Sequence, residues 1–111
     1  MLSIIIPTFN ERENVEIISK RISEDLGDYP YEILFVDDST DDTPEFLKRV
    51  SENDSRINYI HREKRGNLAT AVVLGIERSK GELITVMDAD LQHPPEYIPK
   101  MIEAMKDDVD I

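Results

Sequence analysis

The segment LITVMDADLQHPPE, residues 83–96, joins an apolar strand, an acidic turn and the start of a helix. Residues 83–87 are apolar or β-branched, which favours a buried strand, and two prolines at 94 and 95 favour the first turn of a helix. Between these parts, Asp88 and Asp90 are two residues apart in extended backbone, where alternate side chains point the same way. The two carboxylates can therefore face one point in space.

Two like charges at this separation repel each other unless a cation lies between them. Mg²⁺ and Mn²⁺ bind carboxylate oxygens together with substrate phosphates, and the amide oxygen of Gln92 can add a third protein ligand. The spacing therefore favours a metal–phosphate site. The alternative is that Asp90 caps the helix that begins at the prolines, while Asp88 is a solvated strand end.

The same succession of strand and helix recurs along the whole chain. Strands are predicted at 2–6, 31–36, 56–60 and 82–87, and 107–111 has the pattern of the opening of a fifth strand. Helices are predicted after an Asn10–Glu13 capping pair, after a Thr43 cap that precedes Pro44, from Leu68, and over about 94–106. This alternation predicts an α/β fold with a mostly parallel sheet and right-handed crossovers.

The predicted helices carry apolar residues on one face, most clearly the first and the third. In the first helix these residues recur at spacings of three and four, at Val15, Ile18, Ile22 and Leu26. In the third helix the small residues Ala71 and Gly75 indicate close packing on the sheet, in register with Val72 and Ile76.

Each predicted strand is followed by a polar cluster, and parallel sheets bind ligands outside the carboxyl ends of their strands. The clusters are 7–11, 37–38, 62–67 and 88–92. Asp38 can accept a hydrogen bond from a ring N–H of a base or from ribose hydroxyls, and Glu11 can contact the same ligand. The alternatives are a turn arrangement for the Asp37–Asp38 pair and a first-turn helix acid for Glu11.

The densest basic patch of the chain consists of Arg62, Lys64 and Arg65 beside a predicted helix start. Such a patch suits a pyrophosphate, and the alternative is ordinary surface charge. No glycine-rich dinucleotide or P-loop motif is present, and the two histidines lack the i, i+4 spacing of a zinc site.

The composition narrows the class of protein further. The 111 residues include 13 Lys and Arg against 24 Asp and Glu, a net charge of −11, which argues against a nucleic-acid partner. There is no cysteine for a disulfide or a thiol nucleophile. No apolar run has the length of a membrane span and no signal peptide is visible. The expected compartment is the cytosol, with contact to a membrane surface left open.

Three motifs together resemble the family 2 inverting glycosyltransferases of the GT-A fold, and in particular the dolichyl-phosphate mannosyltransferase branch, which transfers sugars to polyprenyl phosphates. They are IIIPTFNEREN at 4–14, VDDSTDDT at 36–43 and MDADLQHPPE at 87–96. The motifs occur in the family's order and span most of the chain. The last is the most specific, because Gln-His-Pro-Pro after Asp-x-Asp separates this branch from most relatives.

The resemblance implies a role for several residues. The donor nucleotide would be contacted by Pro7, Glu11, Asp38, Arg65, Asp88 and Ala89. The divalent cation, Mg²⁺ or Mn²⁺, would be held by Asp88, Asp90 and Gln92, with Asp90 as the catalytic residue. The segment RGNLATA at 65–71 departs from the glycine-leucine pattern of the family, which leaves the alignment of Arg65 open by one residue.

The resemblance also implies a reaction for the full-length protein. A hexose, mannose or glucose, would pass from GDP-mannose or UDP-glucose to a polyprenyl (dolichyl) phosphate at the cytosolic face of a membrane. No general base is assigned, because a phosphate acceptor is already anionic at neutral pH. Since family catalytic domains are longer, we expect residues 1–111 to be the donor-binding half, inactive alone, ending at the start of a fifth strand. The sheet edge left open there favours a homo-oligomer.

Three other classes of protein fit parts of the pattern. A receiver domain of a response regulator is similarly short and acidic, but here the acid pair follows the second strand rather than the first. A catalytically silent nucleotide-binding or assembly module would share the site without the transfer. A nucleotidyltransferase would share the metal–nucleotide chemistry.

Overall fold

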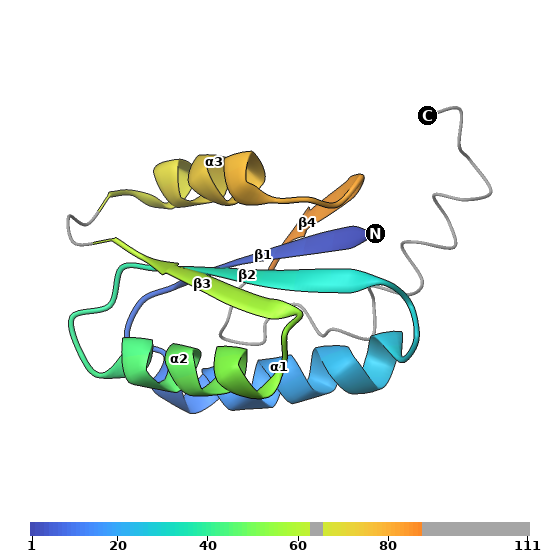
Figure 1. Ribbon diagram of the computed structural model, residues 1–111. Coiled ribbons are helices and arrows are strands. Elements are labelled where there is room, and N and C mark those ends of the chain that lie inside the picture. The colour runs from blue at the N-terminus through green and yellow to red at the C-terminus, as the bar shows by residue number, and fades with distance from the viewer. Residues whose placement is uncertain (63–65, 88–111) are drawn as a thin grey trace.

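The described part of the chain folds into a four-stranded parallel sheet flanked by helices, which confirms the predicted α/β class (Figure 1). The computed structural model describes residues 1–62 and 66–87. In chain order its elements are β1 (Leu2–Thr8), α1 (Arg12–Leu26), β2 (Tyr31–Asp37), α2 (Thr43–Asn53), β3 (Ile57–His61), α3 (Leu68–Arg78) and β4 (Leu83–Val86). The helix expected at 94–106 and the strand expected at 107–111 lie outside the described residues.

The strand order in the sheet is β3-β2-β1-β4, so β1 lies between β2 and β4. This order matches the first four strands of the doubly wound order 3-2-1-4-5-6, whereas a receiver domain has the order 2-1-3-4-5, with its first strand between the second and the third. The receiver alternative is therefore wrong. β1 pairs with β2 over its full length, from Leu2 opposite Tyr31 to Thr8 opposite Asp37.

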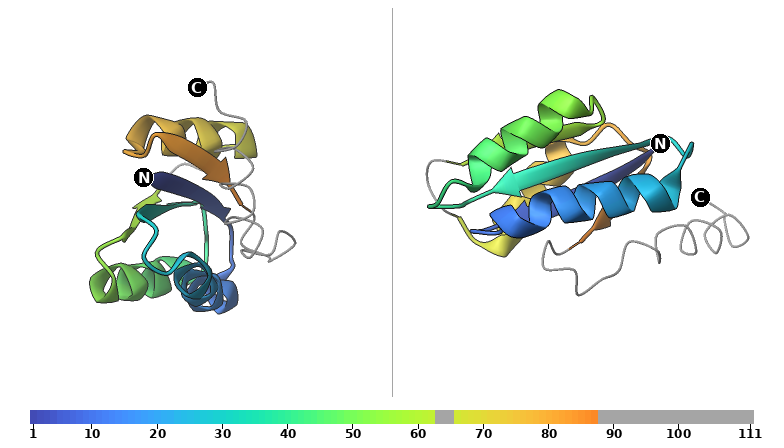
Figure 2. Two further views of the ribbon diagram at one scale, coloured as in Figure 1. Left: turned by 90° about the vertical axis from the view of Figure 1, so that its right-hand side faces the viewer. Right: turned by 90° about the horizontal axis from the view of Figure 1, so that it is seen from below.

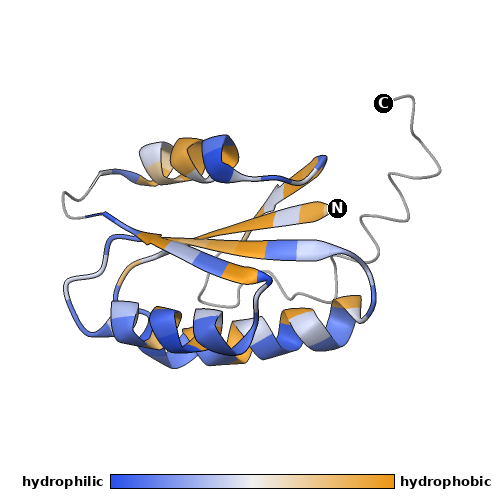
Figure 3. Ribbon diagram, viewed as in Figure 1, coloured by the Kyte–Doolittle hydropathy of each residue, from blue (hydrophilic) through white to orange (hydrophobic). Residues whose placement is uncertain are grey.

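The sheet separates two hydrophobic cores. Helices α1 and α2 cover one face and α3 covers the other (Figure 2). Ile4 and Ile6 of β1 lie in the larger core with the buried face of α1, and Ile5 lies in the smaller core with Ala71 of α3. Figure 3 shows apolar residues running through the strands and hydrophilic residues over much of α1 and α2. Strands buried on both faces explain the continuous apolar runs in the sequence.

Helix α1 buries the predicted face, Val15, Ile18, Ile22 and Leu26, but it does not begin with the expected capping box. Its N-cap position is Glu11, which makes no side-chain capping bond. Asn10 instead has a φ of 53°, and its Oδ1 accepts hydrogen bonds from the backbone N–H of Thr40 at 2.9 Å and of Asp41 at 3.2 Å. The Asn10 cap was wrong because this side chain joins the β1–α1 loop to the β2–α2 loop.

Helix α2 begins one residue earlier than expected. Thr43 is its first residue rather than its cap, and the N-cap position, Asp42, makes no side-chain capping bond. Asp41 Oδ1 accepts from the Thr43 N–H at 2.9 Å and from Thr43 Oγ1 at 2.5 Å. The first residue of α2 therefore donates its backbone N–H and its hydroxyl to an acid that lies two residues before the helix.

Helix α3 has the close contact with the sheet that its small residues predicted. A Cβ placed on Gly75 would lie 2.5 Å from Cγ2 of Ile5, so only glycine leaves room for this strand. Ala71 and Gly75 are buried, whereas Ile76, expected in the same register, is 45% exposed. The helix starts with a capping box between Asn67 and Thr70.

The amino-terminal edge of the sheet is held by one buried carboxylate, that of Glu32. Its Oε2 accepts from Ser3 Oγ at 2.5 Å and from the Lys80 N–H at 2.5 Å, while Ser3 Oγ accepts from the Gly81 N–H at 2.7 Å. These bonds join β1, β2 and the approach to β4. Within residues 1–62 and 66–87, we find no helix with the length and apolar character needed to cross a bilayer.

Candidate functional site

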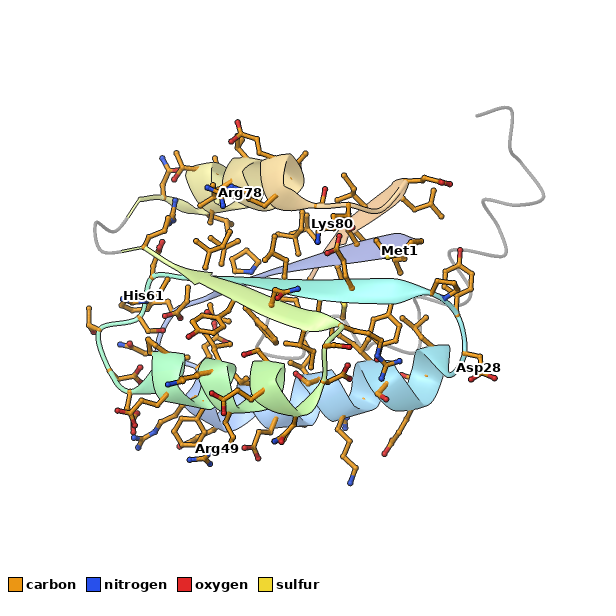
Figure 4. All side chains as sticks on the ribbon, in the orientation of Figure 1. Met1, Asp28, Arg49, His61, Arg78 and Lys80 are labelled. Carbon is orange, nitrogen blue, oxygen red and sulfur yellow. The ribbon has the colours of Figure 1, made fainter. Side chains whose placement is uncertain are left out.

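The carboxyl ends of β1 and β2 and the start of α3 enclose a cavity of about 500 Å³. Its lining residues are Pro7, Thr8, Phe9, Glu11, Val36, Asp38, Gly66, Asn67, Leu68 and Ala71. Figure 4 shows this edge at His61, opposite the edge that carries Met1 and Asp28. The cavity therefore lies where the strand-end rule places ligands in an open parallel sheet.

Asp37, the last residue of β2, is fully buried at this edge of the sheet. Its Oδ1 accepts from Thr8 Oγ1 at 2.6 Å and from Ser39 Oγ at 2.5 Å. Its Oδ2 lies 2.7 Å from Nδ1 of His61, a half-buried ring at the end of β3. Because Asp37 joins the ends of three adjacent strands, it is a structural centre of the edge rather than a cavity wall.

Asp38, the next residue, lines the cavity and forms a bidentate ion pair with Arg62. Arg62 Nε donates to Asp38 Oδ1 at 2.5 Å and Nη2 donates to Oδ2. The side chains are 14% exposed for Arg62 and 11% for Asp38. The hydrogen bonds that Arg62 donates to the Asp38 carboxylate outweigh the opposing effect of burial and raise the pKa of Arg62 above its ordinary value. The positive charge of Arg62 is thus compensated within the protein, whereas the sequence suggested a counter-charge for pyrophosphate.

The cavity places three predicted donor-binding residues together: Pro7 at the end of β1, Glu11 at the start of α1 and Asp38 after β2. The loop that carries Glu11 is fixed by Asn10, through its Oδ1 contacts and through its own N–H, which donates to Ser39 Oγ at 2.8 Å. The remaining predicted residues, Arg65, Asp88, Ala89, Asp90 and Gln92, lie outside the described residues.

Several lining residues were not predicted from the sequence. Phe9 lies at the cavity with 38% of its surface exposed, and Asn67 and Leu68 contribute the start of α3. Phe9 could have been found because it lies inside the polar cluster after the first strand. The Asp38–Arg62 pair had no local signal, because its members are 24 residues apart.

Strand β4 runs toward this same edge of the sheet. β4 pairs with β1 in parallel, and the N–H of Met87, the last described residue, donates to the Ile5 carbonyl at 3.0 Å. Within residues 1–62 and 66–87 no group of three His, Asp or Glu side chains is arranged to hold a metal ion.

Residues 3–111 match the family model described as "Glycosyl transferase family 2". A dolichol-phosphate mannosyltransferase of Pyrococcus furiosus is 46% identical over 99% of this chain and 31% of its own length. A dolichol-phosphate mannosyltransferase of Saccharomyces cerevisiae is 32% identical over 95% of this chain and 41% of its own length. The chain thus spans less than half of the length of each of these two relatives.

Solved structures share the fold at lower identity. The crystal structure of Staphylococcus aureus TarS 1-349 superposes with a TM-score of 0.78 at 22% identity, covering 96% of this chain and 32% of that one. The structure of the same protein in complex with UDP-GlcNAc superposes with a TM-score of 0.75, covering 96% of this chain and 31% of that one. These likenesses support the architecture of the sheet and its helices.

Proposed function

The chain belongs to glycosyl transferase family 2, and from that membership we propose that residues 1–111 supply the nucleotide-sugar-binding part of a metal-dependent inverting glycosyltransferase. The observation that carries the proposal is the cavity at the carboxyl edge, which brings Pro7, Glu11 and Asp38 together. A volume of about 500 Å³ falls in the range of small-molecule sites. Its wall combines carboxylates with the apolar surfaces of Pro7, Phe9 and Leu68, a mixture that suits a base and a ribose.

The proposed cation site consists of Asp88, Asp90 and Gln92, with Asp90 as the catalytic residue and Ala89 beside the donor. Two carboxylates and an amide oxygen form a set of hard oxygen donors, which fits Mg²⁺ or Mn²⁺. A cation bound there would stabilise negative charge on the departing diphosphate. Arg65 is proposed to approach the same diphosphate. The protein's other contribution is to position the donor through the cavity.

We propose a polyprenyl phosphate as the acceptor of the full-length protein, at the cytosolic face of a membrane. Relatives of the chain support this acceptor: besides the dolichol-phosphate mannosyltransferases, an undecaprenyl-phosphate 4-deoxy-4-formamido-L-arabinose transferase of Yersinia enterocolitica is 36% identical. In the proposed step an acceptor phosphate oxygen bonds to the anomeric carbon of the sugar while the bond from that carbon to the diphosphate oxygen breaks. The donor is proposed to be GDP-mannose or UDP-glucose.

Calorimetric titration tests the donor site. GDP, UDP and CDP are titrated with and without Mn²⁺ into the wild type, Asp90→Ala and Asp28→Ala. We expect metal-dependent binding of at least one nucleotide, its loss in Asp90→Ala, and its retention in Asp28→Ala, which removes an exposed acid at the opposite edge of the sheet. Binding that ignores Mn²⁺, or that survives Asp90→Ala, would refute the metal site.

A further inference from the structure

Arg62 connects the two walls of the cavity. It follows β3, and its guanidinium reaches Asp38 after β2 with two of its nitrogens. The third nitrogen, Nη1, donates to Thr70 Oγ1 at 3.0 Å in the first turn of α3. Thr70 is itself fixed by the capping box, in which its N–H donates to Asn67 Oδ1 at 2.8 Å. One side chain thereby sets the position of Asp38 relative to the helix start across the cavity.

The backbone around Arg62 is shaped to accommodate the guanidinium. A Cβ on Gly66 would lie 2.8 Å from Arg62 Nη1 and 2.4 Å from Thr70 Oγ1. Only a residue without a side chain leaves the guanidinium its present place. Bidentate arginine–carboxylate pairs fix orientation as well as charge, because two parallel bonds hold both planar groups in one geometry. Each carboxylate oxygen of Asp38 still has acceptor capacity beyond its bond to Arg62.

We propose that Arg62 is a positioning residue for base recognition: it holds the Asp38 carboxylate as a fixed, ionised acceptor at the cavity and so selects bases that present a ring N–H. This inference rests on the proposed nucleotide site and extends it to a residue with no direct contact to the diphosphate. Guanine and uracil carry a ring N–H, whereas the corresponding ring nitrogens of adenine and cytosine are acceptors that an ionised carboxylate repels. Base selectivity therefore depends on Arg62.

The test measures base selectivity rather than affinity alone. GDP, ADP, UDP, CDP and the base-free probe pyrophosphate are titrated with Mn²⁺ into the wild type, Arg62→Gln and Arg62→Lys. We expect Arg62→Gln to weaken the preferred nucleotide by about 10- to 100-fold and to reduce its preference over ADP and CDP. Pyrophosphate affinity should stay unchanged. Lysine keeps the charge but lacks the planar fork, so Arg62→Lys should recover only part of the selectivity.

A matched control is available in the same chain. Arg56 makes an equivalent bidentate pair with Asp54, with Nε donating to Oδ1 at 3.0 Å and Nη2 to Oδ2 at 2.9 Å, next to the start of β3. Arg56→Gln removes the same kind of bond away from the cavity and should leave all five affinities unchanged. An equal loss of selectivity in Arg56→Gln would show a general structural effect and overturn the proposal.

A double-mutant cycle with Asp38→Asn tests whether Arg62 acts through Asp38. We expect Arg62→Gln to have no further effect on selectivity in the Asp38→Asn background. A full additional loss there, or a weakened pyrophosphate affinity in Arg62→Gln alone, would mean that Arg62 contacts the phosphates and would overturn the proposal. If Arg62→Gln does not fold, Arg62→Lys carries the test. Failure of the wild type to bind any nucleotide would instead refute the proposed function.

Discussion

Asp37 and Asp38 are neighbours in sequence, yet the end of β2 gives them different surroundings. Asp37 points into the edge of the sheet, where two hydroxyl groups and His61 surround its carboxylate. Asp38 lines the cavity with Arg62 as its partner. Successive residues of an extended chain face opposite sides, so one acid serves the structure and the next remains available to a ligand.

We expect Asp37→Ala to lower the free energy of unfolding by about 2–4 kcal/mol, because the hydroxyls of Thr8 and Ser39 lose a buried charged acceptor. Urea denaturation followed by circular dichroism measures this loss. The exposed acid Asp28 provides the control, since Asp28→Ala should shift the urea midpoint only slightly. Equal midpoints for the two variants would contradict a structural role for Asp37.

At the scale of single elements, the close contact between α3 and β1 depends on a glycine, Gly75, which has no side chain. Gly75→Ala places a methyl group 2.5 Å from Ile5 Cγ2. Overpacking costs about 1–3 kcal/mol, which exceeds the gain of up to about 1 kcal/mol from removing a helical glycine. We therefore expect Gly75→Ala to destabilise the protein in thermal and urea unfolding.

The background Ile5→Ala supplies the control for this contact. It removes all three side-chain atoms that a Cβ at position 75 would meet, so Gly75→Ala should be neutral or stabilising there. A loss of the same size in both backgrounds would show that the cost of the alanine does not come from the contact with Ile5.

The Asp54–Arg56 pair, in the connection from α2 to β3, should contribute less to the stability of the protein at acid pH. The hydrogen bond from Arg56 holds the pKa of Asp54 below its ordinary value of 3.8. A depressed folded pKa gives stability that is present above 3.8 and lost as the pH falls through the folded value. Wild type should therefore exceed Asp54→Asn in stability at neutral pH, by less than about 1 kcal/mol for this partly exposed pair.

Urea midpoints of the wild type and Asp54→Asn, measured from about pH 6 to about pH 3, check this expectation. The difference between the two proteins should narrow toward the acid end. A constant difference would mean that Asp54 acts through packing rather than through its ionised carboxylate.

The elements were more predictable than their ends. Strand interiors followed from apolar runs that two-sided burial requires, and all four predicted strands within the described residues are present. The cap predicted at Asn10 failed because its partner lies in another loop: Oδ1 of Asn10 accepts from the N–H of Thr40, 30 residues away. Local patterns describe competition between near neighbours in sequence, and they do not show which loops the sheet brings together.

At the scale of the whole molecule, the sequence indicated at which ends of the strands the candidate site lies. It did not indicate which side chains form hydrogen bonds and ion pairs with one another there. The strand-end rule placed Pro7, Glu11 and Asp38 on one side, and the structure gathers them at one cavity. Which cation of the basic patch would meet Asp38 depends on the path of the chain between β3 and α3. The Glu32 network at the other edge was likewise missed, because it requires the sheet register.

The outer edge of β4 is the place where two copies of residues 1–111 should meet. Within the described part of the chain β4 pairs with β1 alone, and Ile84 and Val86 are 42% and 43% exposed. Unpaired strand edges favour pairing with another chain. We expect the mean mass in sedimentation velocity to rise with protein concentration, and Ile84→Lys to suppress the rise.

The variant Ile17→Lys provides the comparison, because Ile17 is a similarly exposed isoleucine, 47%, on α1. It should associate like the wild type. Association that persists in Ile84→Lys, or that is lost equally in both variants, would argue against the β4 edge.

The central place of β1 also bears on how the protein is made. Among the described strands β1 is synthesised before the others, and it can pair with β2 soon afterwards, but its other neighbour is β4, the last of the described strands. A nascent chain that pauses before residues 83–86 emerge would leave one side of β1 without its neighbouring strand. Synthesis speed through that interval, and any holdase that shields the strand, should therefore govern the yield of folded protein.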